Sequence, residues 1–390
     1  MKTRPFQRSF IILIKIFTIG VSLLMVPIIL LVSVLLPWKG IVSLIVFILP
    51  LLLLVLWVIR MMLCGNLRRK EAPVSFYTVI TVSALFWLVF CAVSVSVSLK
   101  KTDAYLQRMT PKKVIALTTD IANDIFRIES QKTEGLFSNR GQKRQLFKQY
   151  ARFYASIFFP FLRDQNDIPI LNYHVKSYGF FDTGVLFQEI YIYQQYYFKA
   201  NKPAPWIIDC GSHIGMSILY FKALYPEARI LAFEPAPETF KLLRENVKRN
   251  QLKDVRLENK AVSNQEGKLK FYGDRSVRSS LLKERGSGEG IEVDVVKLSD
   301  SIDRTVDFLK IDVEGAEDLV LDDLVASGKL SLVSQMVIEY HHHIVKDTDR
   351  LSRFLKILED HNFGYQIEGS SQPPYKRMEF EDIMISAYQK

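Results

Sequence analysis

Cysteine is scarce in this chain, and the three cysteines present show no paired spacing. They are Cys64, Cys91 and Cys210, and the first two lie in or beside long apolar stretches. This distribution excludes a disulfide framework and a cysteine zinc site, and it fits a reducing compartment. The chain also has no internal repeat and no long low-complexity tract, so a repeat architecture is excluded.

Apolar residues are abundant and unevenly distributed. Hydrophobic residues make up 49% of the 390 residues, although 24% are charged. Three apolar stretches, at 9–36, 41–63 and 76–98, are each long enough to cross a hydrocarbon core of about 30 Å as a helix. We therefore predict an all-α transmembrane region at 1–102, with two or three hydrophobic helices.

The charges around these stretches leave the topology of the membrane region open. Basic residues precede the first stretch and follow the second and the third. Three full spans cannot satisfy the positive-inside rule at all of these flanks, so either one stretch does not span or one flank breaks the rule. The first stretch is too long for the apolar part of a signal peptide, which favours an anchor.

A basic helical connector is predicted at 103–164. The net charge of +10 lies mostly in the membrane-proximal half, where RGQKRQLFKQYAR at 140–152 is a basic run with interleaved aromatic residues. Such a run is typical either of nucleic-acid binding or of a helix on an anionic membrane surface. The neighbouring apolar stretches favour the second, so we expect membrane lipids and no nucleic acid as partners.

From residue 165 to 390, short apolar runs alternate with helical patterns. The strand-like runs are WIID, ARILAFEP, VRLENKAV, VDFLKIDV and LVSQMVIEY, with terminal pieces around 363–368 and 383–388. A helical pattern at 186–198 precedes the first of them. This alternation predicts an α/β domain with a parallel sheet covered by helices on both faces. Ligands of such sheets bind beyond the carboxyl ends of the strands.

A glycine turn follows the first strand, where DCGSHIG leads from Asp209 into a helix. Gly211 permits a positive φ and a close approach of ligand to backbone, and Gly215 permits close packing of helix and strand. The turn lacks the Lys-Ser/Thr of a P-loop, and Asp209 replaces the first glycine of the dinucleotide fingerprint. A buried acid opposes a pyrophosphate and suits a positively charged ligand. A turn without any ligand is the alternative.

The second strand ends at Glu234, about twenty residues after the glycines. An acid at this position is suited to bind both hydroxyls of a ribose, although an exposed turn is compatible with it too. Glycines, a ribose-binding acid and an acid near a positive charge together predict S-adenosylmethionine as the cofactor. Its methionine tail would use the amides of the glycine turn, with an acid for the ammonium group.

Lys310, Asp312 and Glu314 alternate with apolar residues in FLKIDVEGAE at 308–317. In an extended segment they point to one side, which predicts carboxylates beside the methyl donor. Gly315 permits a turn into the next helix, and Glu317 lies in the first turn of that helix. The carboxylates are suited to orient an acceptor hydroxyl, to act as general base or to hold a divalent cation. Helix N-terminal capping is the alternative.

Three adjacent histidines, His341 to His343, follow Glu339 at the end of the fifth strand. A histidine at a strand mouth can deprotonate a hydroxyl near neutral pH or ligate a metal. Adjacent histidines of an extended chain face opposite ways, so at most two share one site. We predict that His341 belongs to the active site and that the other two are bystanders, with a solvated loop as the alternative.

Together these motifs resemble the FkbM family of S-adenosylmethionine-dependent methyltransferases, within the class I Rossmann-like superfamily. The resemblance covers about 186–390 and rests on IIDCGSHIGMSIL, ILAFEPAPETFKLLRENVKRN, KAVSNQEGKLKFY, SSL, FLKIDVEGAEDLVL and VIEYH. It implies a Rossmann-like, seven-stranded, mostly parallel sheet in a methyltransferase domain at 165–390. Family members methylate hydroxyls of varied acceptors, including sugars and polyketides.

The resemblance also implies which residues contact the ligands. The glycine turn would lie at the methionine part of the cofactor, Glu234 at the ribose and residues around Ala261 near the adenine. Ser212 and His213 stand where the family commonly has Ala-Asn. The cofactor-binding residues predicted in this way are Asp209, Gly211, Ser212, His213, Gly215, Glu234 and Ala261. Asp312 and Glu314 would lie toward the acceptor, and no metal site is assigned.

The sequence therefore predicts a membrane-anchored O-methyltransferase whose catalytic domain lies in the cytoplasm, where S-adenosylmethionine is available. The acceptor expected is a hydroxyl of a small molecule, a sugar or a lipid-linked glycan, with Asp312, Glu314 or His341 taking the proton. One alternative is a membrane scaffold whose methyltransferase-like domain has lost catalysis and serves as a binding module. An NAD-dependent Rossmann protein is disfavoured by Asp209.

Overall fold

The computed structural model describes residues 120–121, 123–125, 127–128, 135–138, 140–158, 163–164, 166–273, 280–284, 290–342, 344, 350–369 and 381–390. All of them belong to one of two compact units of the chain, Pro73–Lys390. The predicted membrane region at 1–102, with its three apolar stretches, lies outside the described residues, as does the connector up to residue 119. Within the described ranges, no helix is both long and apolar enough to cross a bilayer.

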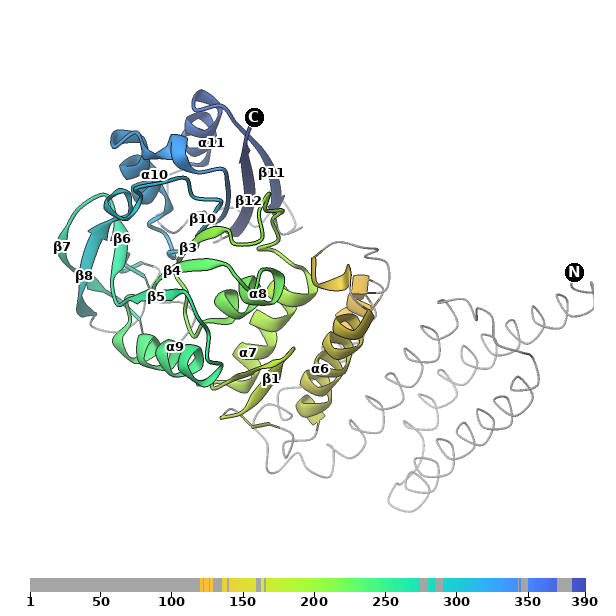
Figure 1. Ribbon diagram of the computed structural model, residues 1–390. Coiled ribbons are helices and arrows are strands. Elements are labelled where there is room, and N and C mark those ends of the chain that lie inside the picture. Colours follow the sequence, from red (N-terminus) through yellow and green to blue (C-terminus); the bar gives the residue numbers. More distant parts are fainter. Residues whose placement is uncertain are drawn as a thin grey trace, which may run out of the picture. The chain divides into compact units, whose positions relative to one another are not determined.

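A seven-stranded sheet with the order β11-β12-β10-β9-β3-β4-β5 is the centre of this unit (Figure 1). The strands are β3 (Trp206–Cys210), β4 (Arg229–Phe233), β5 (Val255–Glu258), β9 (Phe308–Ile311), β10 (Gln335–His342), β11 (Phe363–Gly369) and β12 (Glu381–Gln389). Neighbours from β10 to β5 are parallel, whereas β12 is antiparallel to both of its neighbours. The predicted Rossmann-like, seven-stranded sheet is confirmed.

Helices cover both faces of the sheet, as the alternating pattern predicts (Figure 1). The four that follow parallel strands are α8 (Met216–Leu224), α9 (Pro237–Arg249), α10 (Glu317–Ala326) and α11 (Leu351–Asp360). Side chains of a strand alternate between the faces, so neighbouring residues of β3 join different cores. Ile207 packs in the cluster that contains α8 and α9, and Ile208 in the cluster that contains α10 and α11.

The core extends to elements that precede β3 in the chain. These are α6 (Arg140–Phe158), α7 (Phe180–Phe187) with its π-helical continuation η3 (Gln188–Ile192), and a hairpin of β1 (Ile168–Ile170) and β2 (Tyr173–Val175). The helix predicted at 186–198 is therefore observed at 180–192. It ends earlier than the apolar pattern because Gln194 has a left-handed φ of 52°.

The basic run at 140–152 lies in α6, and its apolar side faces the domain. Leu146 and Tyr150 are buried in the same cluster as α8 and α9, and Phe147 packs against this cluster. Arg144 and Lys148 are exposed. The aromatic residues interleaved in this run therefore belong to the core, and only its basic side is left to face a partner.

The run VRLENKAV, which the sequence presents as one strand, divides between two sheets. Its first part is β5, and its second part is β6 (Ala261–Ser263), which joins β8 (Ile291–Lys297) and β7 (Gly267–Phe271) in a three-stranded sheet. Asn259 Nδ2 holds the bend between them by donating to the carbonyl oxygens of Glu234 at 2.8 Å and Pro235 at 3.0 Å. Short 3-10 helices span Gly135–Ser138, Leu298–Ser301 and Lys329–Leu332.

Candidate active site

The turn after β3 has the left-handed backbone that the sequence predicts. Gly211 has a φ of 87° and Gly215 a φ of 93°. The N–H groups of Gly211 and Ser212 donate to the carbonyl oxygen of Phe233 at 3.0 and 2.9 Å, which ties the turn to the end of β4. A Cβ on Gly211 would lie 1.8 Å from the carbonyl oxygen of Asp312, so glycine alone fits this turn.

Gly215 serves the packing of two helices. It is the N-cap of α8, and a Cβ there would lie 2.8 Å from Leu243 Cδ1 on α9. From the sequence, close packing of helix and strand is predicted at this glycine. The close neighbour is instead the helix that follows the next strand.

Asp209 is fully buried, and its carboxylate is held by two side chains of the protein. Ser217 Oγ donates to Asp209 Oδ2 at 2.5 Å, and Lys310 Nζ lies 3.3 Å from Asp209 Oδ1. Ser212 is buried in the same place, and its Oγ donates to the Asp209 carbonyl oxygen at 3.0 Å. The contact of Asp209 with the ammonium group of the cofactor stays a prediction.

Lys310 lies between two acids. Its Nζ is 3.1 Å from Asp312 Oδ2 as well as 3.3 Å from Asp209, and it donates to the Gly211 carbonyl oxygen at 2.9 Å. Burial lowers the pKa of Lys310, but the charges of Asp312 and Asp209 outweigh it and place the pKa above its ordinary value. A charged Lys310 therefore joins the end of β9 to the glycine turn.

A cavity of about 680 Å³ is lined by residues at the carboxyl ends of β3, β4, β9 and β10. Ligands of parallel sheets bind at this edge. Six of the predicted site residues line the cavity: Gly211, His213, Glu234, Ala261, Asp312 and Glu314. Four predicted residues are not among its lining residues: Asp209, Ser212, Gly215 and His341. Asp209, Ser212 and Gly215 stabilise the glycine turn after β3 without lining the cavity, and His341 contacts Glu314.

Glu234 and His213 form one wall of the cavity. The Glu234 carboxylate accepts the backbone N–H groups of His213 and Ala236, both at 2.9 Å. Burial raises the pKa of Glu234 to about 7 and lowers the pKa of His213 to about 4, so the imidazole is neutral. Both ring nitrogens of His213 are buried and have no hydrogen-bond partner among the described residues.

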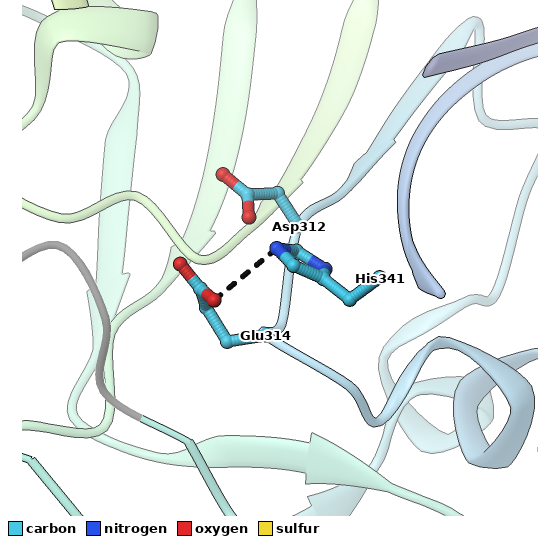
Figure 2. Close-up of side chains that lie close together, drawn as sticks. All are labelled: Asp312, Glu314 and His341. Carbon is cyan, nitrogen blue, oxygen red and sulfur yellow. Dashed lines mark ion pairs between the residues drawn. The ribbon is translucent and has the colours of Figure 1, made fainter. Parts of the chain in front are cut away.

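Another wall of the cavity carries Asp312 and Glu314, and His341 contacts Glu314. Figure 2 shows the carboxylates of Asp312 and Glu314 and the ring of His341 converging from the end of β9 and from β10. His341 Nε2 lies 3.2 Å from Glu314 Oε2, and His341 Nδ1 lies 2.9 Å from Glu317 Oε1. Burial lowers the pKa of His341, but the charges of Glu317 and Glu314 raise it well above its ordinary value. The two carboxylates therefore favour the charged form of His341.

The neighbouring histidines differ from His341 in their surroundings. His342 is half-buried, and its ring centroid lies 6.1 Å from that of Tyr340. His343 lies outside the described residues.

Three acids that line this wall were not predicted as site residues: Glu189, Glu339 and Asp382. Burial, with the charges of Asp312 and Asp382, raises the pKa of Glu189 to about 7. Burial also raises the pKa of Glu339 well above its ordinary value. The position of Glu339 near the end of a predicted strand could have identified it as a site residue. Glu189 offered none, because it reaches the cavity from the π-helix η3, a backbone form that helical periodicity does not reveal.

Two groups of side chains have the geometry of metal ligands. Asp312, Glu314 and His341 offer ligand atoms within 4.8 Å of one another, and so do Glu339, His341 and Asp382. His341 belongs to both groups, and each of its ring nitrogens already faces a carboxylate. A histidine that binds a metal must be a neutral imidazole, whereas the charges of Glu317 and Glu314 favour the protonated form of His341, so we assign no metal site.

Comparison with known proteins shows that this fold is that of a methyltransferase. The methyltransferase FkbM domain matches residues 209–367. Methyltransferase 1 of Beauveria bassiana (strain ARSEF 2860) is 30% identical over 177 residues, covering 39% of this chain and 71% of that protein. The 31-O-demethyl-FK506 methyltransferase FkbM of Streptomyces tacrolimicus is 29% identical over 218 residues, covering 47% of this chain and 80% of that protein. The chain belongs to the FkbM methyltransferase family.

A solved methyltransferase structure is also similar to this chain. The structure of TYW2 from M. jannaschii in complex with AdoMet is 13% identical, has a TM-score of 0.27, and covers 48% of this chain and 68% of that chain. The cofactor predicted from the sequence is the one expected of the family to which the chain belongs.

Proposed function

We propose that this protein is an O-methyltransferase that uses S-adenosylmethionine to methylate a hydroxyl of a sugar or lipid-linked glycan at a membrane surface. The observation that carries the proposal is that one cavity holds both residues suited to the cofactor and carboxylates suited to an acceptor hydroxyl. Glu234, His213 and Ala261 line one part, and the carboxylates of Asp312 and Glu314 line another. The relative named 31-O-demethyl-FK506 methyltransferase supports oxygen as the methylated atom.

The residues of the first wall fit the cofactor. The Glu234 carboxylate faces the cavity and suits the two hydroxyls of a ribose. The ring nitrogens of His213 are buried beside it without a partner among the described residues, as expected of groups that a ligand completes. Ala261 presents a small apolar side chain suited to the face of an adenine.

The acidic wall would position the acceptor and take its proton. When bound, S-adenosylmethionine supplies an electrophilic methyl carbon, and the electron pair of the broken C–S bond stays on sulfur. The acceptor oxygen forms the new bond to that carbon, and its proton passes to a carboxylate. Asp312 and Glu314 suit this role better than His341, because His341 lies behind Glu314 and is already protonated.

Titration of S-adenosylmethionine into the protein by calorimetry tests the cofactor proposal. We expect saturable binding that NAD does not reproduce, and at least about tenfold weaker binding in Glu234→Gln, because a charged acceptor for the ribose hydroxyls is lost. Wild-type affinity should fall as the pH drops below about 7, where Glu234 takes up a proton, and Glu234→Gln should lose this dependence.

Glu238→Gln is the matched control for this titration. Glu238 is an exposed acid in the first turn of α9, so its substitution should leave binding unchanged. Absence of binding by the folded wild-type protein would refute the proposal and leave the inactive scaffold as the better account.

The membrane is proposed as the location of the acceptor, with the catalytic domain on the cytoplasmic side. This rests on the apolar stretches of the sequence and on the exposed basic residues Arg144 and Lys148 of α6, which suit anionic lipid headgroups. With radiolabelled S-adenosylmethionine, we expect methyl transfer to glycolipid and lipid-linked glycan fractions and not to free sugars. Equal labelling of free sugars would exclude selectivity for a lipid-linked acceptor while leaving the methyltransferase activity established.

A further inference from the structure

His341 is held between carboxylates from two directions. Its side chain is fully buried on β10. Nδ1 faces Glu317 Oε1 at 2.9 Å, and Nε2 faces Glu314 Oε2 at 3.2 Å, with Asp382 Oδ1 farther away at 3.7 Å. A neutral imidazole carries one N–H, so it can donate to one of these carboxylates and not to both. The geometry is that of an imidazolium whose Nδ1–H donates to Glu317 and whose Nε2 side forms an ion pair with Glu314.

Glu317, His341 and Glu314 form an array of charged side chains, and Glu317 is its inner end. It begins α10, yet its side chain is only 2% exposed, which is unusual for a residue that serves only the helix N-terminus. Its Oε1 accepts the backbone N–H of Gly315 at 2.9 Å in addition to the His341 hydrogen bond. A buried carboxylate is costly without a cation, and His341 is the cation that the structure provides.

Glu314 is the outer end, and it lines the cavity. Its φ of 55° lies in the left-handed region, which is uncommon for a residue with a side chain. Two contacts fix this turn: Ser280 Oγ donates to the Glu314 carbonyl oxygen, and the next residue, Gly315, is tied to Glu317. The array Glu317–His341–Glu314 thus runs from a buried helix end to the acidic wall of the cavity.

We propose that Glu317 is a positioning residue that keeps His341 as an imidazolium and, through it, holds the Glu314 carboxylate in place at the acceptor wall. The role of Glu314 toward an acceptor rests on the proposed function, whereas the state of His341 does not. Other acids surround the ring, namely Asp312, Glu339 and Asp382, but Glu317 is the one that bonds Nδ1. Removing the charge of Glu317 should therefore release a proton from His341 and free Glu314.

The test compares Glu317→Gln with wild type in the full-length protein labelled with ¹⁵N-histidine. Long-range proton–nitrogen spectra report whether each ring nitrogen of His341 is protonated, with His341→Asn used for assignment. In wild type we expect both nitrogens to stay protonated beyond neutral pH. In Glu317→Gln the His341 titration should shift to lower pH by at least about one unit. Glu317→Asp, which keeps the charge, should restore part of the shift.

Turnover and cofactor binding are then measured on the same proteins. The rate of S-adenosylhomocysteine formation with a lipid-linked glycan extract should fall at least about tenfold in Glu317→Gln, with unchanged affinity for S-adenosylmethionine. Glu238→Gln, the same change in the first turn of α9, should match wild type in every readout.

The outcomes separate this inference from the proposed function. An unchanged His341 titration in Glu317→Gln, or turnover that falls no further than in Glu238→Gln, would overturn the positioning role. If the wild-type protein bound no S-adenosylmethionine, the proposed function would fail, but the titration of His341 would still decide whether Glu317 sets its charge.

Discussion

Replacing Lys310 with methionine is expected to cost about 3–5 kcal/mol of the free energy of unfolding, enough to unfold a marginally stable domain. The lysine is 2% exposed and pairs with Asp209, which is fully buried, and with Asp312. Methionine fills a similar volume but leaves both carboxylates without their cation. Urea denaturation followed by circular dichroism measures the loss.

Lys222→Met is the matched control for this change. Lys222 is also buried, but its Nζ donates to the carbonyl oxygen of Ala228 and has no carboxylate within salt-bridge distance among the described residues. Its loss leaves only neutral carbonyl acceptors unpaired, those of Ala228 at 2.5 Å and Pro226 at 3.5 Å, so the cost should be about 1–3 kcal/mol. Equal losses in the two variants would show that burial of the lysine stem, and not the pairing of acids, is what stabilises the protein.

The pH dependence of the Lys310 effect has a definite sign. The pKa of Lys310 is raised by folding, so its contribution to stability is fully present below the pKa of the unfolded lysine and is lost only above the folded pKa. The difference in stability between wild type and Lys310→Met should therefore stay constant from about pH 6 to about pH 9.

The pairing of Lys310 with Asp209 illustrates what the sequence could not predict. Both residues stand in recognisable strands, and the alternation of Lys310 with Asp312 was visible. Asp209 and Lys310 are also register partners on the adjacent parallel strands β3 and β9, but about a hundred residues separate them in the chain. Without the strand order, Lys310 reads as a residue that points to a ligand. In the structure it neutralises the acids beneath the glycine turn.

Short sequence patterns were sufficient to predict those structural features that a single segment of the chain determines. The positive φ of Gly211, the position of Glu234 on the cavity wall and the strand that ends before Asp312 all follow from short sequence patterns. The surroundings of the amphipathic helix α6 were harder to predict, because a basic and aromatic pattern is equally compatible with a membrane surface and with a domain core. Its aromatic residues proved to be core, which only the packing of Tyr150 and Phe153 reveals.

Replacing Gly211 with alanine is expected to abolish cofactor binding and methyl transfer, with at least about a hundredfold loss of affinity for S-adenosylmethionine. Two costs combine in this variant. Alanine is strained at a φ of 87°, which costs about 1 kcal/mol, and its Cβ would lie 1.8 Å from the carbonyl oxygen of Asp312. The clash is with backbone, so either the turn or the end of β9 must move. Both carry residues of the cavity wall.

Gly328→Ala separates the clash from the strain. Gly328 has a similar φ of 70°, but nothing lies within 4 Å of a Cβ built there. Calorimetric titration should give wild-type affinity for this control, and urea denaturation should give a loss of only about 1 kcal/mol. If Gly211→Ala bound S-adenosylmethionine as tightly as Gly328→Ala does, the turn could not be a wall that touches the cofactor. Loss of binding in Gly211→Ala alone, with the fold retained, would place the methionine end of the cofactor against this turn.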